Sequence, residues 1–209
     1  MIALYLTRTE YLPSREELLR RVLLDVSADK RDEWHRGSEK RVLESLSGIL
    51  LVQRGLELAG FSCFGAGLRY EPTGRPFLEN LEVDFSISHR DGVTACVLMW
   101  GNVGRVGVDA ERLQGRSQAS MERISERWFS DGERKLFRGC PNEMQFLQIW
   151  TGKEALSKQS GCGLGGLAAC DVTVCQESKL KSYCMDNLVV TLCVPDHTVL
   201  PEEVVWIDL

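Results

Sequence analysis

The stretch GRVGVDAER at residues 104–112 alternates apolar and polar side chains, which predicts a half-buried β-strand. Because successive side chains of a strand point to opposite faces, its inner valines and alanine share one face, and Asp109 and Glu111 share the other. Two neighbouring carboxylates repel each other unless a positive group lies between them, and magnesium prefers oxygen ligands. The pair is a candidate metal site, although a solvated strand face is the commoner reason for such a pattern.

The segments on either side of this strand have similar patterns, each with a long amphipathic helix, a glycine after it, and strands. In the first half we predict strands at 1–6, 83–87 and 93–99, helices at 14–24 and 38–59, and a turn at 72–76. In the second half we predict helices at 118–128, 131–138 and 143–159, and strands around 170–176, 188–194 and 203–207. The pattern favours an α+β fold of two α/β subdomains, residues 1–103 and 104–209, joined near Gly101–Gly104.

Composition narrows the class of protein. The 209 residues carry a formal net charge of -5, so no overall basic field attracts nucleic acid. No stretch approaches the roughly 20 apolar residues of a membrane span, and the start lacks the pattern of a signal peptide. The eight cysteines are scattered without a CxxC pair, which indicates reduced thiols, most of them small apolar fillers. We expect a cytoplasmic protein with no nucleic-acid or membrane partner.

A second charged pattern lies in WTGKEALSK at residues 150–158, within a predicted helix. Trp150, Glu154 and Lys158 are spaced i, i+4, i+8, so they share one helical face. Glu154 is a candidate third carboxylate, and Lys158 is suited to neutralising a phosphate beside it. An ordinary Glu–Lys surface pair explains the same spacing, so this pattern alone does not decide the function.

Four motifs in order are more informative than any one of them. GRPFL (74–78), FSISH (85–89), GVDAE (107–111) and WTGKEALSKQSGCGL (150–164) together resemble the 4'-phosphopantetheinyl transferases of the surfactin-synthetase-activating (Sfp) type. The resemblance spans residues 74 to 164, and its last motif is the most specific. It implies a monomer of two similar α/β halves related by a pseudo-twofold axis, with coenzyme A bound in the cleft between them.

The resemblance also implies roles for individual residues. Magnesium ligands fall on Asp109, Glu111 and Glu154. Catalytic roles fall on Glu154, which accepts the serine proton directly or through a water, and on Lys158 and Asp109. The implied coenzyme-binding residues are Lys30, Ser45, Gly74, Arg75, Pro76, Ser88, His89, Lys153 and Lys158. Three departures from the family pattern, Glu33, Ser86 and Arg90, bear on how the 3'-phosphate is held.

The activity that the resemblance implies is magnesium-dependent transfer of the 4'-phosphopantetheine moiety of coenzyme A. The acceptor is a serine of an acyl, peptidyl or polyketide carrier protein, and adenosine 3',5'-bisphosphate is released. One alternative is a non-catalytic scaffold that binds coenzyme A or a carrier protein, and another is a magnesium-dependent nucleotide pyrophosphatase. We expect the carrier to dock on the segment 113–129, with Met121, Ile124, Arg116 and Arg123 as contacts.

Overall fold

The protein is described here by a computed structural model that covers residues 1–101, 104–175 and 177–209. Its first half contains β1 (Ile2–Arg8), α1 (Arg15–Arg21), β2 (Asp25–Val26), α2 (Ala28–Arg36), α3 (Glu39–Leu58), β3 (Gly67–Tyr70), β4 (Pro76–Glu79), β5 (Val83–Arg90) and β6 (Val93–Trp100). Its second half contains β7 (Gly107–Arg112), α4 (Gln118–Trp128), α5 (Asp131–Gly139), α6 (Glu143–Ser160), a 3-10 helix (Leu164–Ala169), β8 (Ser178–Met185), β9 (Leu188–Pro195) and β10 (Val205–Trp206). This is the α+β fold that the sequence predicts.

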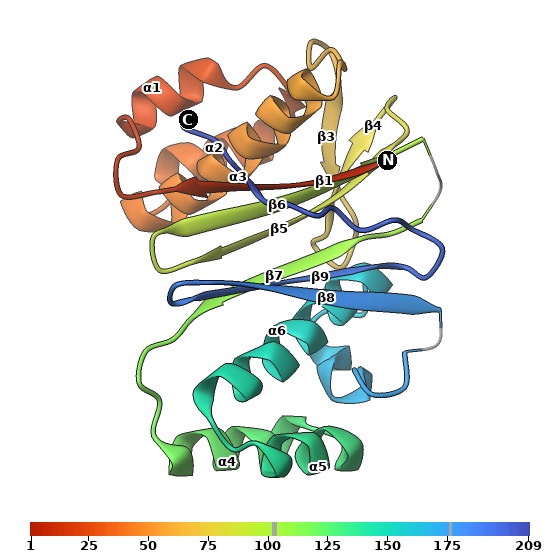
Figure 1. Cartoon of the computed structure of the whole chain (residues 1–209). Coiled ribbons are helices and arrows are strands. Elements are labelled where there is room, and N and C mark those ends of the chain that lie inside the picture. The colour runs from red at the N-terminus through yellow and green to blue at the C-terminus, as the bar shows by residue number, and fades with distance from the viewer. Residues whose placement is uncertain (102–103, 176) are drawn as a thin grey trace.

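The two main sheets lie between two groups of helices (Figure 1). The upper sheet has the strand order β10-β1-β6-β5 and is covered by α3, while the lower sheet has the order β7-β9-β8 and is covered by α6. A small third sheet, β2-β3-β4, lies beside the upper one. The final strand β10 pairs in parallel with β1, so the chain returns from its second half to the first sheet. Residues 102 and 103, at the predicted join, lie outside the described residues.

Apolar side chains form three cores that correspond to these layers. One lies between α3 and the upper sheet, where Leu46 and Leu98 are fully buried. A second lies between the two sheets and includes Leu4, Val108 and Leu192. The third lies below the lower sheet and contains the aromatic cluster around Phe146. The apolar face of β7 therefore fills the space between the sheets, as the alternation at 104–112 predicts.

Side chains of β5 join the two sheets, because β5 lies along β7. Ser86 Oγ accepts a hydrogen bond from the Val108 amide (3.2 Å), and Ser88 Oγ accepts one from the Ala110 amide (3.3 Å). Asp84 accepts a third from the Val106 amide at 2.7 Å. Alternate residues of a strand share one face, so this row of side chains satisfies amides of β7 that lack a backbone partner on that side. It fixes β7 against the first half.

The predicted secondary structure is wrong at one segment and incomplete at others. The strand predicted around 170–176 is a 3-10 helix end followed by turns over residues 170–175, and residue 176 lies outside the described part. The edge strand β8 was not predicted, because its sequence SKLKSYCM carries lysines that interrupt the apolar alternation. Lysines on an edge strand protect it from pairing with another chain. The short elements α2, β2, β3 and β4 were also not predicted.

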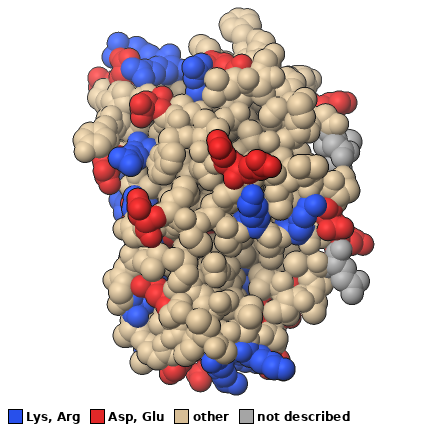
Figure 2. Space-filling view, in the orientation of Figure 1, with Lys and Arg blue, Asp and Glu red and all other residues tan. Residues whose placement is uncertain are grey.

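The helix stops agree with the sequence. Gly60 follows α3 with φ +86°, and Gly161 follows α6 with φ +74°, a backbone conformation that favours glycine. Charges of both signs are interspersed on the face of the molecule in Figure 2. Among the residues that the structure describes, none of the helices combines the length and apolar character that crossing a bilayer requires.

Candidate active site

A cavity of about 250 Å³ lies where the two halves meet. Its first-half wall is the turn at 73–76 together with residues 85–87 of β5. Its second-half wall is the end of α6 and the loop after it, through Ser157, Lys158 and Gly161. Gly74 and Pro76, two of the predicted coenzyme-binding residues, line this cavity. The cavity therefore lies where the sequence predicts a cleft. Its walls come from three of the four motifs: GRPFL, FSISH and WTGKEALSKQSGCGL.

Arg75 ties the two halves together beside this cavity. Its guanidinium donates to Asp84 Oδ2 at 2.8 Å, to the Phe85 carbonyl at 3.1 Å and to the Val106 carbonyl at 3.0 Å. It also donates to the Lys158 carbonyl at the end of α6. Since these protein groups use its donors, Arg75 holds the cavity wall in shape and connects its two sides, and its role in coenzyme binding stays a prediction.

The carboxylate of Asp109 is buried on the opposite side of β7 from the apolar core, with 2% of the residue exposed. Its Oδ1 atom accepts from Ser88 Oγ and from Lys158 Nζ, both at 2.8 Å. Its Oδ2 atom is buried and accepts no hydrogen bond from an N–H or hydroxyl group of the described residues, while the protonated Glu154 carboxyl group hydrogen-bonds to Asp109. A buried carboxylate oxygen without such a donor is costly, so Asp109 is positioned to receive a further positive group.

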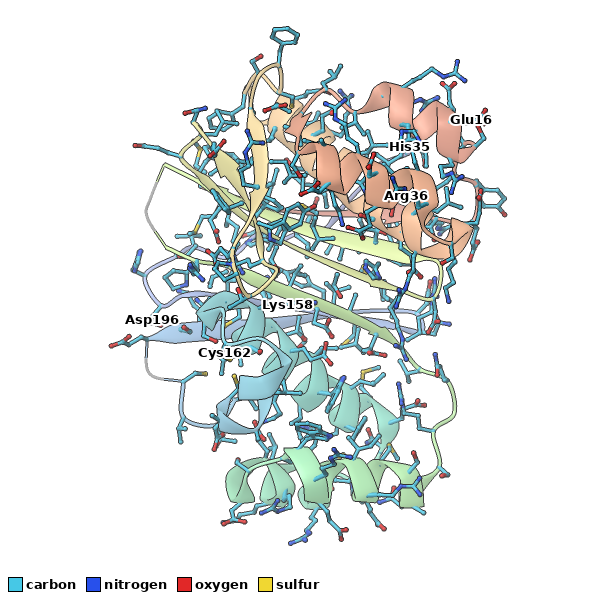
Figure 3. The ribbon with its side chains drawn as sticks, turned by 180° about the vertical axis from the view of Figure 1, so that it is seen from behind. Glu16, His35, Arg36, Lys158, Cys162 and Asp196 are labelled. Atoms are coloured by element: carbon cyan, nitrogen blue, oxygen red, sulfur yellow. The ribbon has the colours of Figure 1, made fainter. Side chains whose placement is uncertain are left out.

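Lys158 is the cation of the site. Its Nζ atom donates to Asp109 Oδ1 and to the Val108 carbonyl at 2.9 Å, while the side chain remains 31% exposed. Figure 3 shows it at the end of α6 that faces the first half. The i, i+4 pattern of α6 thus directs this lysine to the acidic strand and to the cavity at once.

Glu154 lies one helical turn before Lys158, next to Asp109. Burial raises the pKa of its carboxyl group to about 8, and the negative charge of Asp109 adds to the effect, whereas Lys158 opposes it. A carboxyl group with a pKa near neutrality can hold or release a proton at physiological pH. The three predicted metal ligands therefore influence one another electrostatically, although Glu154 comes from a different element than the other two.

Glu111 is held by two arginines. Arg90 Nε lies 3.1 Å from its Oε2 atom, and Arg116 Nη2 lies 3.4 Å from the same atom. Burial raises the pKa of Glu111 and Asp109 adds to the rise, while the two guanidinium groups act in the opposite direction. In this arrangement Glu111 is satisfied by protein cations.

The chemistry of these side chains fits a divalent cation. They supply three carboxylates, which hard cations prefer, and one buried oxygen that accepts from no N–H or hydroxyl group of the described residues. In the described part of the chain, no three acidic, histidine or cysteine side chains already form a closed metal-binding group. Binding of an ion therefore requires the carboxylates to exchange some of their contacts with Lys158, Arg90 and Arg116.

A second cavity of about 380 Å³ adjoins the first, with Pro76 and Ile87 lining both. Besides Pro76, it contains the predicted coenzyme-binding residues Lys30, Ser45 and His89, which come from α2, α3 and β5. Lys30 pairs with Glu33 at 2.8 Å, and Ser45 accepts a hydrogen bond from Trp34 Nε1 at 2.9 Å. The sequence did not identify the cavity residues Arg41, Glu44 and Tyr70. The spacing of Arg41 and Ser45, four residues apart on α3, is a signal that could have found the first.

The structure corrects the prediction that Lys153 binds the coenzyme. Its side chain is fully buried, and its Nζ atom lies 2.8 Å from Glu133 Oε2 and also donates to the Cys170 carbonyl. Because a helix turns about 100° per residue, Lys153 points into the second half while Glu154 faces β7. Ser88 is likewise buried, and its hydroxyl bonds to Asp109, so it positions that carboxylate.

Not all of the predicted carrier contacts in the segment 113–129 lie on the surface. Met121 is buried in the aromatic core, so it is not a surface contact, whereas Ile124 is half-buried. Glu143 at the start of α6 accepts hydrogen bonds from the amides of Gln114, Gly115 and Arg116, which fix the segment before α4. Arg116 is bound to Glu111, which leaves Arg123 as the exposed arginine of the pair.

The alternation of residues in β5 could have predicted that Arg90 faces β7. Asp84, Ser86, Ser88 and Arg90 alternate along β5, so they share the face that meets β7. Asp84, Ser86 and Ser88 accept hydrogen bonds from β7 or from the residue before it, and Arg90 forms an ion pair with Glu111 of β7. Every second side chain of β5 therefore contacts the GVDAE strand. Ser86 and Arg90, which depart from the family pattern, are two of these contacts.

Comparison with known proteins agrees with this geometry. Residues 105–193 match the family model of the 4'-phosphopantetheinyl transferase superfamily. The chain is 31% identical to the 4'-phosphopantetheinyl transferase AcpT of Escherichia coli (strain K12) over 145 residues, which are 66% of this chain and 72% of that protein. The chain belongs to the 4'-phosphopantetheinyl transferase superfamily.

Two further relatives carry the same activity in their names. The 4'-phosphopantetheinyl transferase HetI of Nostoc sp. (strain PCC 7120) is 29% identical over 122 residues, which cover 54% of this chain and half of that protein. A 4'-phosphopantetheinyl transferase of Bacillus subtilis is 28% identical over 155 residues, 69% of this chain and 64% of that protein. This family membership indicates a transferase.

Proposed function

We propose that this protein transfers the 4'-phosphopantetheine moiety of coenzyme A to a serine of an acyl, peptidyl or polyketide carrier protein, in a magnesium-dependent reaction. The second product is adenosine 3',5'-bisphosphate. The observation that carries the proposal is the contact of Lys158 with Asp109, beside Glu154, at the cavity between the halves. It brings a cation and the carboxylates of two motifs to one place, as transfer of a charged phosphoryl group requires.

In this proposal, Asp109, Glu111 and Glu154 hold magnesium, which supplies charge neutralisation at the pyrophosphate when bound. Lys158 is exposed enough to leave Asp109 in part and donate to the transferred phosphate. Glu154, with its raised pKa, accepts the proton of the attacking serine directly or through a water. Ser88 keeps Asp109 oriented through its 2.8 Å hydrogen bond.

The two adjoining cavities suit two different parts of coenzyme A. The cavity beside Gly74 and Pro76 has mixed polar and apolar walls suited to the adenine. The neighbouring cavity holds Lys30, Arg41 and His89, which suit the 3'-phosphate. We assign coenzyme binding mainly to residues 1–103, and the magnesium site and carrier docking to residues 104–209.

The test is to incubate the protein with an apo carrier protein, coenzyme A and magnesium, and to weigh the carrier by intact mass spectrometry. Addition of one phosphopantetheine to the carrier serine is expected, with loss of transfer when magnesium is chelated. The matched control is Glu154→Gln, which keeps the shape of the side chain. Consumption of coenzyme A without carrier modification would instead indicate a pyrophosphatase, and binding without either reaction would indicate a scaffold.

A further inference from the structure

Two thiols are in contact at the end of α6. Cys162 follows Gly161 directly after the helix, and Cys170 ends the 3-10 helix that comes next. Their Sγ atoms lie 3.7 Å apart, and both cysteines are free. Cys162 is exposed and Cys170 is buried, so the pair combines one accessible sulfur with one protected sulfur. Figure 3 shows Cys162 close to Lys158 at this end of the helix.

The local sequence holds the two sulfurs together. A Cβ atom at Gly166 would lie 2.6 Å from Cys162 Sγ, so the absent side chain provides the space that Cys162 occupies. Ser160 donates a hydrogen bond to Cys162 Sγ at 3.1 Å, and Ser157 Oγ lies 3.4 Å from it. Although burial opposes the effect, these hydrogen bonds and that of Cys170 lower the pKa of Cys162. A lowered pKa increases the fraction of reactive thiolate.

The thiol pair is next to the site described above. Gly161 and Gly163, which flank Cys162, line the 250 Å³ cavity between the halves, as does Ser157. Ser157 Oγ also donates to the Gly163 carbonyl at 2.8 Å. A displacement of Cys162 should therefore also displace Gly161, Gly163 and Ser157, which form part of the cavity wall.

We propose that Cys162 and Cys170 are a reversible oxidation site that forms a disulfide with a peroxide as the oxidant. The Cys162 thiolate attacks one oxygen of hydrogen peroxide and the O–O bond breaks, which gives a sulfenic acid and a hydroxide that takes up the proton lost by the thiol to form one water. Cys170 sulfur then attacks Cys162 sulfur, the S–O bond breaks, and the hydroxyl leaves as a second water with the Cys170 proton. Two thiols are oxidised and one peroxide is reduced to two waters. A dithiol reductant reverses the reaction by exchange.

Disulfide formation has an expected consequence for the cavity, and this part rests on the proposed function. A disulfide brings the sulfurs to about 2.05 Å, so residues 161–163 move toward the 3-10 helix. Such a shift alters the wall formed by Gly161 and Gly163 and breaks the sulfur contact with Ser157. We expect the apparent affinity for coenzyme A to fall several-fold on oxidation and to recover after reduction.

The first experiment does not depend on transferase activity. Reduced protein is treated with about one equivalent of hydrogen peroxide, alkylated, digested without reduction and mapped by mass spectrometry. A bridge that joins the peptides of Cys162 and Cys170, lost in Cys162→Ser and in Cys170→Ser, is expected. The control Cys184→Ser removes an exposed thiol on β8 and should leave the bridge intact. A bridge elsewhere, or oxidation of Cys162 without any bridge, overturns the proposal.

The second experiment measures coenzyme A binding by calorimetry before and after oxidation. The wild type should lose affinity and regain it with a dithiol, whereas Cys162→Ser should keep its affinity under peroxide. If the bridge forms but affinity does not change, the oxidation site stands and its effect on the cavity is wrong. If the reduced protein does not bind coenzyme A at all, the proposed function fails independently of the disulfide.

Discussion

Lys158 Nζ and Asp109 Oδ1 lie 2.8 Å apart, although the two residues are separated by 49 positions in the chain. The contact joins α6 to β7 beside the cavity between the two halves. It makes Lys158 both a partner of a buried carboxylate and a cavity residue.

Replacing Asp109 by asparagine should reduce transfer by at least about 10²-fold, comparable to removing one preorganised electrostatic partner of a transition state. Asparagine keeps the hydrogen bond with Ser88 but removes the charge that pairs with Lys158. Steady-state kinetics at saturating magnesium measure the effect, and circular dichroism checks the fold. Near-normal turnover in a folded Asp109→Asn protein contradicts the assignment.

Replacing Lys158 should mainly affect turnover, whereas replacing Lys153 should mainly affect the free energy of unfolding. Lys158→Ala should lower kcat and should cost less stability than Lys153→Ala, because the Lys158 side chain is partly exposed whereas the Lys153–Glu133 pair is fully buried. Lys153→Ala leaves Glu133 buried without its partner, and breaking such a pair costs about 3–5 kcal/mol of the free energy of unfolding. Denaturant unfolding and kinetics on both variants separate the two outcomes. A stable Lys153→Ala protein with a low kcat speaks against this division.

The pH dependence of stability should reveal Glu154 in the metal-free protein. Its pKa is raised by burial and by Asp109 from 4.5 to about 8, so the folded state holds the proton more tightly than the unfolded state. The free energy of unfolding therefore decreases as the pH rises from about 4.5 to about 8, and the decrease is complete above that. Glu154→Gln removes this contribution, so its curve should be flatter than that of the wild type.

Unfolding measured in a chelator from pH 4 to pH 9 gives both curves. Adding magnesium should restore part of the lost stability in the wild type at pH 8 and less in Glu154→Gln. Identical slopes in the two proteins exclude the raised pKa, and an equal effect of magnesium on both argues that Glu154 is not a ligand.

Arg75→Met should weaken the junction of the two halves. The variant keeps an unbranched side chain but leaves Asp84, whose pKa burial already raises, without its guanidinium partner. Because Asp84 is partly exposed, we expect a loss of roughly 2 kcal/mol, below the ~3–5 kcal/mol of a fully buried pair. Thermal unfolding measures the loss, and coenzyme A affinity should fall with it. Unchanged stability shows that the junction does not depend on Arg75.

Carrier docking on α4 is best tested at Arg123, because reversing Arg116 also disturbs Glu111. Arg123→Glu should raise the apparent KM for an acidic carrier at low salt, with a smaller effect at high salt and none on coenzyme A. The matched control is Arg36→Glu on α2, an exposed arginine of the other half (Figure 3). Equal effects of the two reversals indicate general charge attraction.

The amino-acid sequence by itself determined the periodic elements and the acidic strand. The alternation of 104–112 specifies which side of β7 is apolar, and the i, i+4, i+8 spacing on α6 specifies that Glu154 and Lys158 share a face. Glycine stops placed the ends of α3 and α6 correctly because this signal depends only on nearby backbone groups. The motifs in their order also indicated the 4'-phosphopantetheinyl transferases, and the comparisons confirm that superfamily.

Only the tertiary structure decided which partners these side chains meet. Arg75 bonds to groups up to 83 residues away, and Arg90 reaches a carboxylate on another strand. Lys153 and Lys158 are five residues apart on one helix, yet one is buried against Glu133 and the other lines the cavity. Burial and long-range hydrogen bonding depend on how the layers pack, so local periodicity predicts a residue's face but not the group that faces it.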